Sequence, residues 1–156
     1  MELARSTSSW HASVRTGGSA LAEEELHTLW GIYSAIQARD PVELRRRLAH
    51  DFELSLPEGL PWGGTRHGPE GVESVAEVFV EHVDGAWADP DDFLDAGERV
   101  VVLGRARGRA RATGVEFEVP FAHVWALRDE VPSTLHAYFD PSPILEALQG
   151  SSSSVA

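Results

Sequence analysis

The stretch that decides the fold runs from Val115 to Asp140 and reads Val-Glu-Phe-Glu-Val-Pro-Phe-Ala-His-Val-Trp-Ala-Leu-Arg-Asp-Glu-Val-Pro-Ser-Thr-Leu-His-Ala-Tyr-Phe-Asp. Alternation with a period of two predicts two β-strands joined at residues 128–130. The first strand sets one histidine in a row of apolar and aromatic residues on a single face: Phe117, Val119, Phe121, His123, Trp125 and Leu127. Such a histidine is either a hydrogen-bonded core residue or the working group of a pocket.

The preceding segment predicts a strand that pairs with this one through a hairpin at Thr113-Gly114. Without a bulge, Arg111 faces Glu116 and Arg109 faces Glu118 on the outer side of the sheet. The same register puts only small residues on the His123 side: Gly104, Ala106, Gly108, Ala110 and Ala112. Residues this small leave either a gap filled by neighbours or a void, and a void beside a histidine would be a binding site.

The amino-acid composition narrows the class of molecule that the protein is expected to bind. The formal net charge of −12, with thirteen arginines and no lysine, argues against nucleic-acid binding, because phosphate backbones attract positively charged surfaces. There is no cysteine, and the histidines lack metal-like spacing, so we expect no metal and no cofactor. The sequence has no apolar run long enough to predict a membrane segment. The first twenty residues lack the layout of a secretory signal. The expected protein is cytoplasmic and binds a neutral or weakly polar small molecule.

The order of predicted elements defines the fold class. Two helices, a short strand at 52–56 and a third helix opened by Gly68-Pro69 precede four strands and a short last helix at 144–148. Residues 57–68 are expected to form a loop and 84–92 an acidic link, whereas 1–19 and 150–156 are expected to be tails around one domain at 20–149. Helices segregated from antiparallel strands predict an α+β fold, with a curved sheet wrapped around three N-terminal helices.

Four segments carry a resemblance to a known family. They are Tyr-Ser-Ala-Ile-Gln-Ala-Arg-Asp-Pro-Val-Glu-Leu (33–44), Gly-Gly-Thr-Arg-His-Gly-Pro-Glu-Gly-Val (63–72), His-Val-Trp-Ala-Leu-Arg-Asp (123–129) and His-Ala-Tyr-Phe-Asp (136–140). Together they resemble the SnoaL-like polyketide cyclases and the ketosteroid isomerase-like group of the nuclear transport factor two superfamily. The resemblance implies an α+β cone whose open mouth takes an apolar ligand, and a homodimer packed through the sheet.

The resemblance also implies roles for individual positions. His123 falls where the isomerases keep a protonated aspartate for the oxyanion, and near the acid/base aspartate of the cyclases. The isomerase general base falls at Leu56, which cannot accept a proton, and the isomerase tyrosine falls at Ile32, next to Tyr33. Of the aspartate-arginine-aspartate set of the epoxide hydrolases, only Arg99 is matched.

These observations lead to a functional hypothesis. We expect an enzyme of bacterial secondary metabolism that cyclises or isomerises an apolar polyketide-like intermediate in a hydrophobic cone. A histidine of ordinary pKa, about 6.5, suits proton transfer, so His123 is the expected acid/base group, with Tyr33 as a hydrogen-bond donor. The expected substrate-binding residues are Phe52, Leu54, Leu56, Trp62, Phe79, Val119, Phe121, Trp125, Ala137 and Phe139.

Several alternatives stay open from sequence. The chain could be a non-catalytic small-molecule binding protein of the same fold, an epoxide hydrolase or dehydratase-type relative, or a structural module with a filled core. Trp62 is either a plug over the core or a lid over a cavity. Alternation points His136 and Tyr138 outward, and Asp140 is expected to cap the last helix or to line the mouth of the cone.

Overall fold

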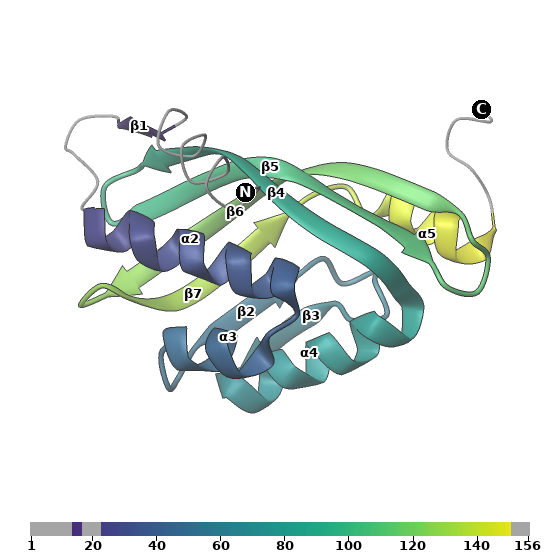
Figure 1. The fold of residues 1–156 in the computed structure, drawn as a ribbon, viewed down its shortest axis with the longest axis horizontal. Coiled ribbons are helices and arrows are strands. Elements are labelled where there is room, and N and C mark those ends of the chain that lie inside the picture. Colours follow the sequence, from purple (N-terminus) through teal and green to yellow (C-terminus); the bar gives the residue numbers. More distant parts are fainter. Residues whose placement is uncertain (1–13, 17–22, 151–156) are drawn as a thin grey trace.

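The computed structural model describes residues 14–16 and 23–150 of the 156-residue chain. Its elements are β1 (Val14–Thr16), α2 (Glu23–Ala38), α3 (Pro41–Arg47), β2 (Glu53–Leu56), β3 (Gly64–His67), α4 (Gly68–His82), β4 (Val83–Asp95), β5 (Arg99–Ala110), β6 (Glu116–Arg128), β7 (Val131–Tyr138) and α5 (Ser142–Gln149). Helices α2, α3 and α4 lie together over part of the sheet, and α5 lies at the far end of the long strands (Figure 1). Within the described ranges, no helix combines the length and the apolar character that crossing a membrane requires.

One curved sheet organises the molecule. Its strand order is β1-β4-β5-β6-β7-β2-β3, with β4 to β7 antiparallel and β2 parallel to β7. The two end strands do not pair with each other, so the sheet is not closed into a barrel. This arrangement confirms the predicted α+β class. Strand β1 pairs with β4 inside the segment expected to be a tail. The remainder of both expected tails lies largely outside the described residues. Ser19, a candidate N-terminal cap of α2 by its sequence, also lies outside them.

Strand β4 corrects the expected acidic link. The chain from Val83 to Asp95 is one strand that pairs with β5 over its whole length, with irregularities between Asp84 and Trp87 and between Pro90 and Asp92. Gly85 has a φ of 65°, the left-handed conformation that a bulge of this kind requires. Because the bulges bend the strand and the carboxylates of Asp84 and Asp89 face away from the core, acidic composition does not prevent strand formation here.

The segment expected to be a loop at 57–68 contains a further strand. Residues Gly64–His67 form β3, which pairs antiparallel with β2 from Leu56 opposite Gly64 to Glu53 opposite His67. The turn before β3 buries Trp62, whose ring meets the ring of Phe79 edge-on at 5.0 Å. Trp62 is therefore a plug that closes the core, which settles the choice between plug and lid.

The connection between β5 and β6 is also longer than predicted. Arg109 pairs with Glu116 and Arg107 with Glu118, so the register differs from the expected one by two residues. Strand β5 ends at Ala110, whose amide donates to the carbonyl oxygen of Val115, and residues 111–115 form the connection. A shift of two preserves the faces, so the arginines still point outward. Ala112, expected on the inner face, is instead exposed in the connection.

The gap predicted above the small residues of β5 is filled. A Cβ atom added to Gly104 would lie 2.7 Å from Cζ of Phe121, and one added to Gly108 would lie 2.8 Å from Cζ of Phe117. Both phenyl rings come from the neighbouring strand β6 and lie over the glycines. The structure thus selects packed neighbours rather than a void at these two positions.

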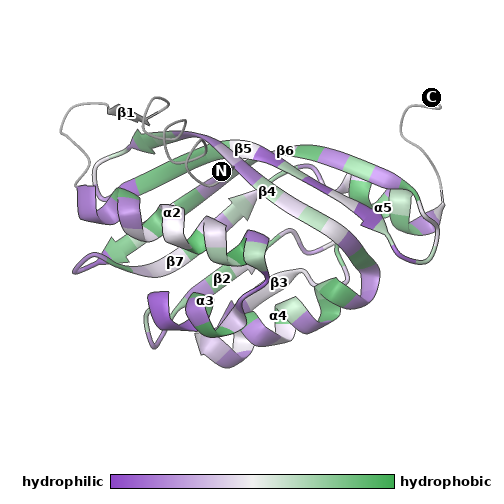
Figure 2. Cartoon of the chain, in the orientation of Figure 1, coloured by the Kyte–Doolittle hydropathy of each residue, from purple (hydrophilic) through white to green (hydrophobic). Residues whose placement is uncertain are grey.

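The helices cover the inner face of the sheet mostly with the residues that their sequence pattern predicts. Leu26, Leu29 and Tyr33 of α2 are buried as predicted, whereas Ile36 in its last turn is exposed. Figure 2 shows the hydrophilic first turn of α2 and the hydrophobic strand segments that run beside this helix.

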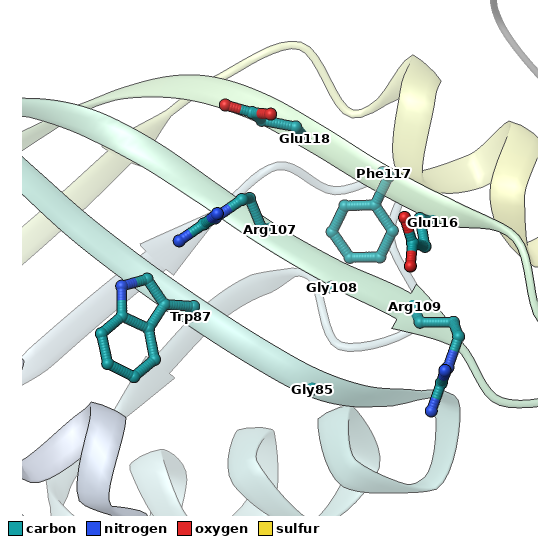
Figure 3. A pocket seen from close by; sticks show the side chains of 8 residues that line it. All are labelled: Gly85, Trp87, Arg107, Gly108, Arg109, Glu116, Phe117 and Glu118. Atoms are coloured by element: carbon teal, nitrogen blue, oxygen red, sulfur yellow. The ribbon is translucent and has the colours of Figure 1, made fainter.

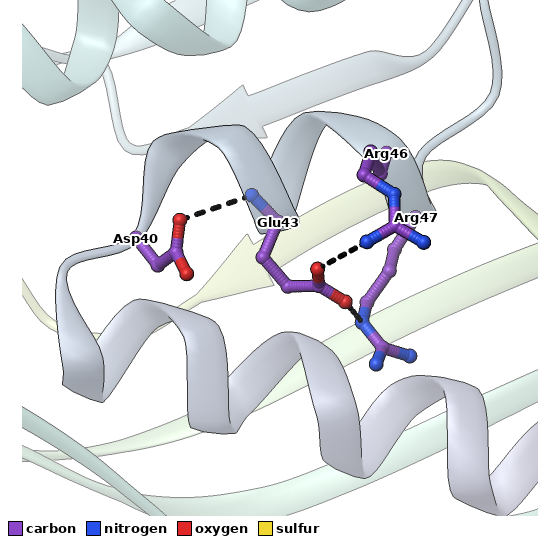
Figure 4. A network of polar contacts seen from close by, with 4 residues as sticks. All are labelled: Asp40, Glu43, Arg46 and Arg47. Atoms are coloured by element: carbon purple, nitrogen blue, oxygen red, sulfur yellow. Dashed lines mark hydrogen bonds and ion pairs between the residues drawn. The ribbon is translucent and has the colours of Figure 1, made fainter.

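Helix α3 begins as its sequence predicts. The Asp40 carboxylate accepts the Glu43 amide at 3.1 Å, and Pro41 occupies the first turn. The Glu43 carboxylate pairs with Arg46 and Arg47 at 2.7 Å each (Figure 4). The positive charges in the last turn of α3 therefore take up this side chain, although Glu43 stands three residues after Asp40, where a glutamate can bond back to the start of a helix.

Candidate active site

Helix α2 and strand β6 together build an aromatic cluster around His123. The imidazole is stacked on the ring of Phe121, with centroids 3.8 Å apart and an interplanar angle of 14°. Tyr33 of α2 lies nearly parallel to the imidazole at 5.8 Å and meets the Trp125 indole edge-on at 6.0 Å. Phe52 extends the cluster, 6.3 Å from Trp125. Alternation along β6 puts three of these five rings on one face, α2 supplies Tyr33, and Phe52 directly precedes β2.

A chain of hydrogen bonds connects three of these side chains. The indole Nε1–H of Trp125 donates to the Tyr33 hydroxyl oxygen at 3.0 Å. The same hydroxyl lies 2.7 Å from Nδ1 of His123. The Tyr33 hydroxyl thus links a helix residue to two strand residues that are 90 and 92 positions away in the sequence. The structure brings together the two residues expected to be catalytic, and it adds Trp125 as their polar partner.

Burial changes the chemistry expected of His123. Loss of hydration lowers the pKa of His123 to about 3, so the ring is neutral at pH 7. This corrects the ordinary value of about 6.5 assumed from sequence, at which the ring could readily take up a proton. Burial raises the pKa of the Tyr33 hydroxyl, an effect opposed in part by the hydrogen bond from Trp125, so this group remains protonated. No charged side chain of residues 23–150 is fully buried, so nothing balances an imidazolium in the core.

The second ring nitrogen of His123 is not engaged by the described residues. His123 keeps partial exposure although its neighbours Phe121 and Trp125 are buried. Nε2 has no hydrogen-bond partner among the described residues. His123 therefore combines partial exposure with a ring nitrogen that no described side chain contacts by a hydrogen bond.

The expected substrate-binding residues fall into two groups. Leu56, Phe79 and Phe139 pack against the core while keeping exposed surface, so a ligand can reach them. The others are buried and contribute to the core that supports the site: Phe52, Leu54, Trp62, Val119, Phe121, Trp125 and Ala137. The aromatic pair of Trp62 and Phe79 is a separate contact from the His123 cluster.

The outer face carries polar groups of a different kind. His136 points outward as predicted, with Nε2 3.9 Å from the Glu53 carboxylate, and His67 approaches the same carboxylate at 3.9 Å. Across the described ranges, no three His, Asp or Glu side chains are arranged to hold a metal ion. Asp140 takes the capping role, because its carboxylate accepts the Ser142 amide at 3.0 Å at the start of α5, which also lowers the Asp140 pKa.

A surface hollow of about 620 Å³ lies on this outer face, over β4, β5 and β6 (Figure 3). It is lined by Trp87, by arginines and by glutamates, and it is open to solvent. Two of its charged residues are already paired, since Arg109 contacts Asp84 at 3.0 Å and Glu118 contacts Arg105 at 3.5 Å. The chemistry at His123 lies on the opposite face of the sheet, so we assign the candidate site to His123 and not to this hollow.

The role of Trp125 is the feature that sequence reasoning missed. Trp125 was expected to line the pocket, and its indole N–H instead bonds the hydroxyl of Tyr33. The signal was present, because Trp125 lies two residues after His123 and so shares its face. A buried indole N–H also needs an acceptor.

Comparisons with solved structures agree with the fold described above. An NTF2-like protein of unknown function from Burkholderia pseudomallei K96243 is 29% identical, with a TM-score of 0.76 over 81% of this chain and 98% of that one. TerC, crystallised with polyporic acid, is 24% identical, with a TM-score of 0.76 over 81% and 99%. A candidate SnoaL-like polyketide cyclase from Jannaschia sp. CCS1 is 16% identical, with a TM-score of 0.72 over 84% and 97%. These structures share the NTF2-like fold.

The sequence itself identifies the family. Residues 31–131 match the model of the SnoaL-like domain, so the chain belongs to this family. The match includes Tyr33, His123 and Trp125. A search of curated proteins gives no match.

Proposed function

We propose that the protein is a small-molecule enzyme of bacterial secondary metabolism, acting in the cytoplasm, that promotes ring closure or isomerisation of an apolar polyketide-like compound. The observation that supports this most is a neutral and partly exposed His123 in an otherwise apolar and aromatic wall. Ligand sites combine such walls with a few polar groups that fix orientation. His123 is the polar group that best meets this description.

The proposed catalysis depends mainly on preorganisation. Holding a flexible substrate with its reacting atoms in contact can contribute about 7–11 kcal/mol in favourable cases, so few catalytic groups are required. The aromatic cluster suits this purpose, because Tyr33, Phe121 and Trp125 are buried and the Tyr33 ring contacts the other two. In this proposal, His123 touches the reacting part of the substrate, and Tyr33 acts through His123.

The names of two structural neighbours are consistent with this ligand class. TerC was crystallised with polyporic acid, and the Jannaschia protein is a candidate polyketide cyclase. Both are under 25% identical to this chain, so they show its fold, and the substrate class is our proposal.

A non-catalytic binding protein is the second candidate. It is favoured by the lack of a general base, since Leu56 occupies the position of the isomerase aspartate and a histidine with a pKa of about 3 accepts protons poorly at pH 7. This candidate predicts tight binding of a polyketide-like compound with no product.

We further propose a homodimer packed through the outer face of the sheet. Trp87, Leu103 and Tyr138 are exposed there, on three different strands. Large apolar side chains clustered on an outer sheet face are typical of protein interfaces. Light scattering after gel filtration tests the proposal, and a monomer at micromolar concentration would contradict it.

The functional test uses purified protein and a panel of linear polyketide-like substrates, followed by mass spectrometry. We expect a cyclised or isomerised product with wild type and with His136→Ala, an outer-face control, and a large loss with His123→Ala. Equal turnover by His123→Ala would overturn the catalytic role of His123. Binding without product by wild type would favour the second candidate.

A further inference from the structure

We infer that Trp125 and Tyr33 are positioning residues that hold His123 as the Nε2–H tautomer, so that the site offers one N–H donor to a carbonyl or enolate oxygen of its ligand. The inference rests on the proposed function only for the identity of the reacting molecule. It replaces proton abstraction by His123 with hydrogen-bond donation as the role of this residue.

The direction of the hydrogen bonds follows from what each group can do. An indole N–H can only donate, so the Tyr33 oxygen accepts the bond from Trp125 at 3.0 Å. The hydroxyl has a single hydrogen, and the atom that can receive it is Nδ1 of His123 at 2.7 Å. Nδ1 is therefore the acceptor, and in a neutral ring the one proton is on Nε2.

The opposite assignment leaves a buried donor without a partner. If Nδ1 carried the proton, the Tyr33 oxygen would accept from both His123 and Trp125, and its own hydrogen would have no acceptor among the contacts of this group. Tyr33 is 1% exposed, so water cannot replace the missing bond. The stack on Phe121 at 3.8 Å also keeps the imidazole plane fixed.

The tautomer determines which ligands the site accepts. An Nε2–H group can donate to an oxygen and cannot accept a proton or a hydrogen bond, so an ammonium group, which has no acceptor, gains nothing there. A carbonyl oxygen becomes a stronger acceptor as it takes up negative charge, so the same donor stabilises an enolate more than a ketone. The surrounding residues require the remainder of the ligand to be apolar. The inferred ligand is an apolar compound with a ketone or enol oxygen.

The tautomer is measured on the intact protein with ¹⁵N-labelled histidine. Long-range ¹H–¹⁵N correlation spectra at pH 7 distinguish a ring nitrogen that carries hydrogen from one that does not. We expect His123 Nδ1 to lack hydrogen and Nε2 to carry it, and the exposed His136 to serve as internal reference. A hydrogen on Nδ1 of His123, or an equal mixture of the two forms, would overturn the inference.

Two variants test the positioning roles. Tyr33→Phe keeps the ring and removes the hydroxyl, so His123 should lose its single tautomer and show both forms. Trp125→Phe removes the donor that directs the Tyr33 hydrogen and should have the same effect in weaker form. If Tyr33→Phe folds and His123 keeps the pure Nε2–H form, then Tyr33 does not position it.

A pair of probes tests the ligand class separately from turnover. We expect 2-acetylnaphthalene, an apolar ketone, to move the His123 Nε2–H resonance downfield, and 2-ethylnaphthalene, its deoxygenated counterpart, to leave it in place. Equal responses to both probes would overturn the ligand class. If the tautomer and the ketone response are found and no substrate is converted, the proposed enzyme fails and this inference stands.

Discussion

Two histidines on adjacent strands show how differently the two faces of one sheet treat the same side chain. His123 of β6 pairs with Ala137 of β7, and the next pair of the ladder is Val124 with His136. His123 lies between the rings of Tyr33 and Phe121, and burial lowers its pKa to about 3. His136 lies on the outer face, 3.9 Å from the Glu53 carboxylate. The alternation of side chains between the two faces of a strand, here called strand parity, decides which imidazole is desolvated and which is beside a carboxylate.

The difference extends beyond these two residues. The inner face consists of packed aromatic and aliphatic groups without a fully buried charge in the described part of the chain. The outer face carries ion pairs such as Arg105 with Glu118 at 3.5 Å, with both side chains exposed. Substitutions on the inner face should therefore cost much more than matched substitutions outside.

The largest expected effect contrasts two tryptophans. Trp125→Ala removes a side chain that is 1% exposed and leaves the Tyr33 hydroxyl without its donor, so unfolding free energy should fall by about 3–5 kcal/mol. Trp87→Ala, at 43% exposure on the outer face, should cost less than about 1 kcal/mol in the monomer. Urea unfolding at a concentration where only monomer is present measures both. Equal losses would show that the two faces do not differ as described.

Two glycines test how tightly the inner face is packed. Gly104→Ala places a Cβ 2.7 Å from Phe121 Cζ and against the carbonyl of Asp89, so it should destabilise by about 1–3 kcal/mol. Gly59→Ala meets only Leu145 Cδ1 at 3.7 Å and should be neutral or stabilising by up to about 1 kcal/mol. Thermal unfolding compares them, and a neutral Gly104→Ala would mean that the inner face can relax around a methyl group.

The pH dependence of stability follows from His123. Its folded pKa of about 3 lies below the unfolded value of about 6.5, so between these pH values the unfolded chain binds a proton that the folded chain does not. This contribution to stability is complete above pH 6.5 and is lost as pH falls toward 3, at a rate approaching about 1.4 kcal/mol per pH unit. His123→Asn should flatten the curve in that window. Parallel curves for wild type and His123→Asn would refute the depressed pKa.

The smallest expected effect is at an exposed ion pair. Arg128 at the end of β6 donates to the Asp51 carboxylate at 2.7 Å, and this hydrogen bond is the main reason that the Asp51 pKa is lowered. Arg128→Ala should return the Asp51 pKa toward its ordinary value with no detectable change in stability, because solvent screens exposed charges. A carboxyl NMR titration measures the shift, with Arg105→Ala as control. An unmoved Asp51 pKa would mean that another group lowers it.

Strand parity was predictable because β6 pairs with β5 in one unbroken register from Arg99 to Arg109. That continuity lets a period of two assign His123 to the inner face over the whole strand. The hairpin error at Thr113-Gly114 shifted the pairing by two residues, which leaves each side chain on its predicted face. Strand β3 and the first part of β4 were missed because Gly64 and the aspartates of 84–92 are typical of loops, and pairing with neighbouring strands overrides that local preference.

The chemistry of the site was less predictable than its location. The pKa of His123 depends on its burial in the folded structure, and its hydrogen-bond partner Tyr33 approaches from α2, 90 residues away in sequence, so no local pattern encodes either feature. The alternation on β6 also could not reveal that Phe121 lies over Gly104 and fills the expected gap. Both features depend on packing between strands and helices, so they require the folded structure.

A pH titration of the histidine Hε1 protons by NMR tests the central claim most directly, because it reports the charge of each imidazole in the folded protein. The account predicts that His123 Hε1 does not move between pH 8 and pH 4.5. A His123 midpoint near pH 6.5 would contradict the account, because the ring on the inner face would then be a hydrated acid/base group and not a neutral donor held by Tyr33 and Trp125.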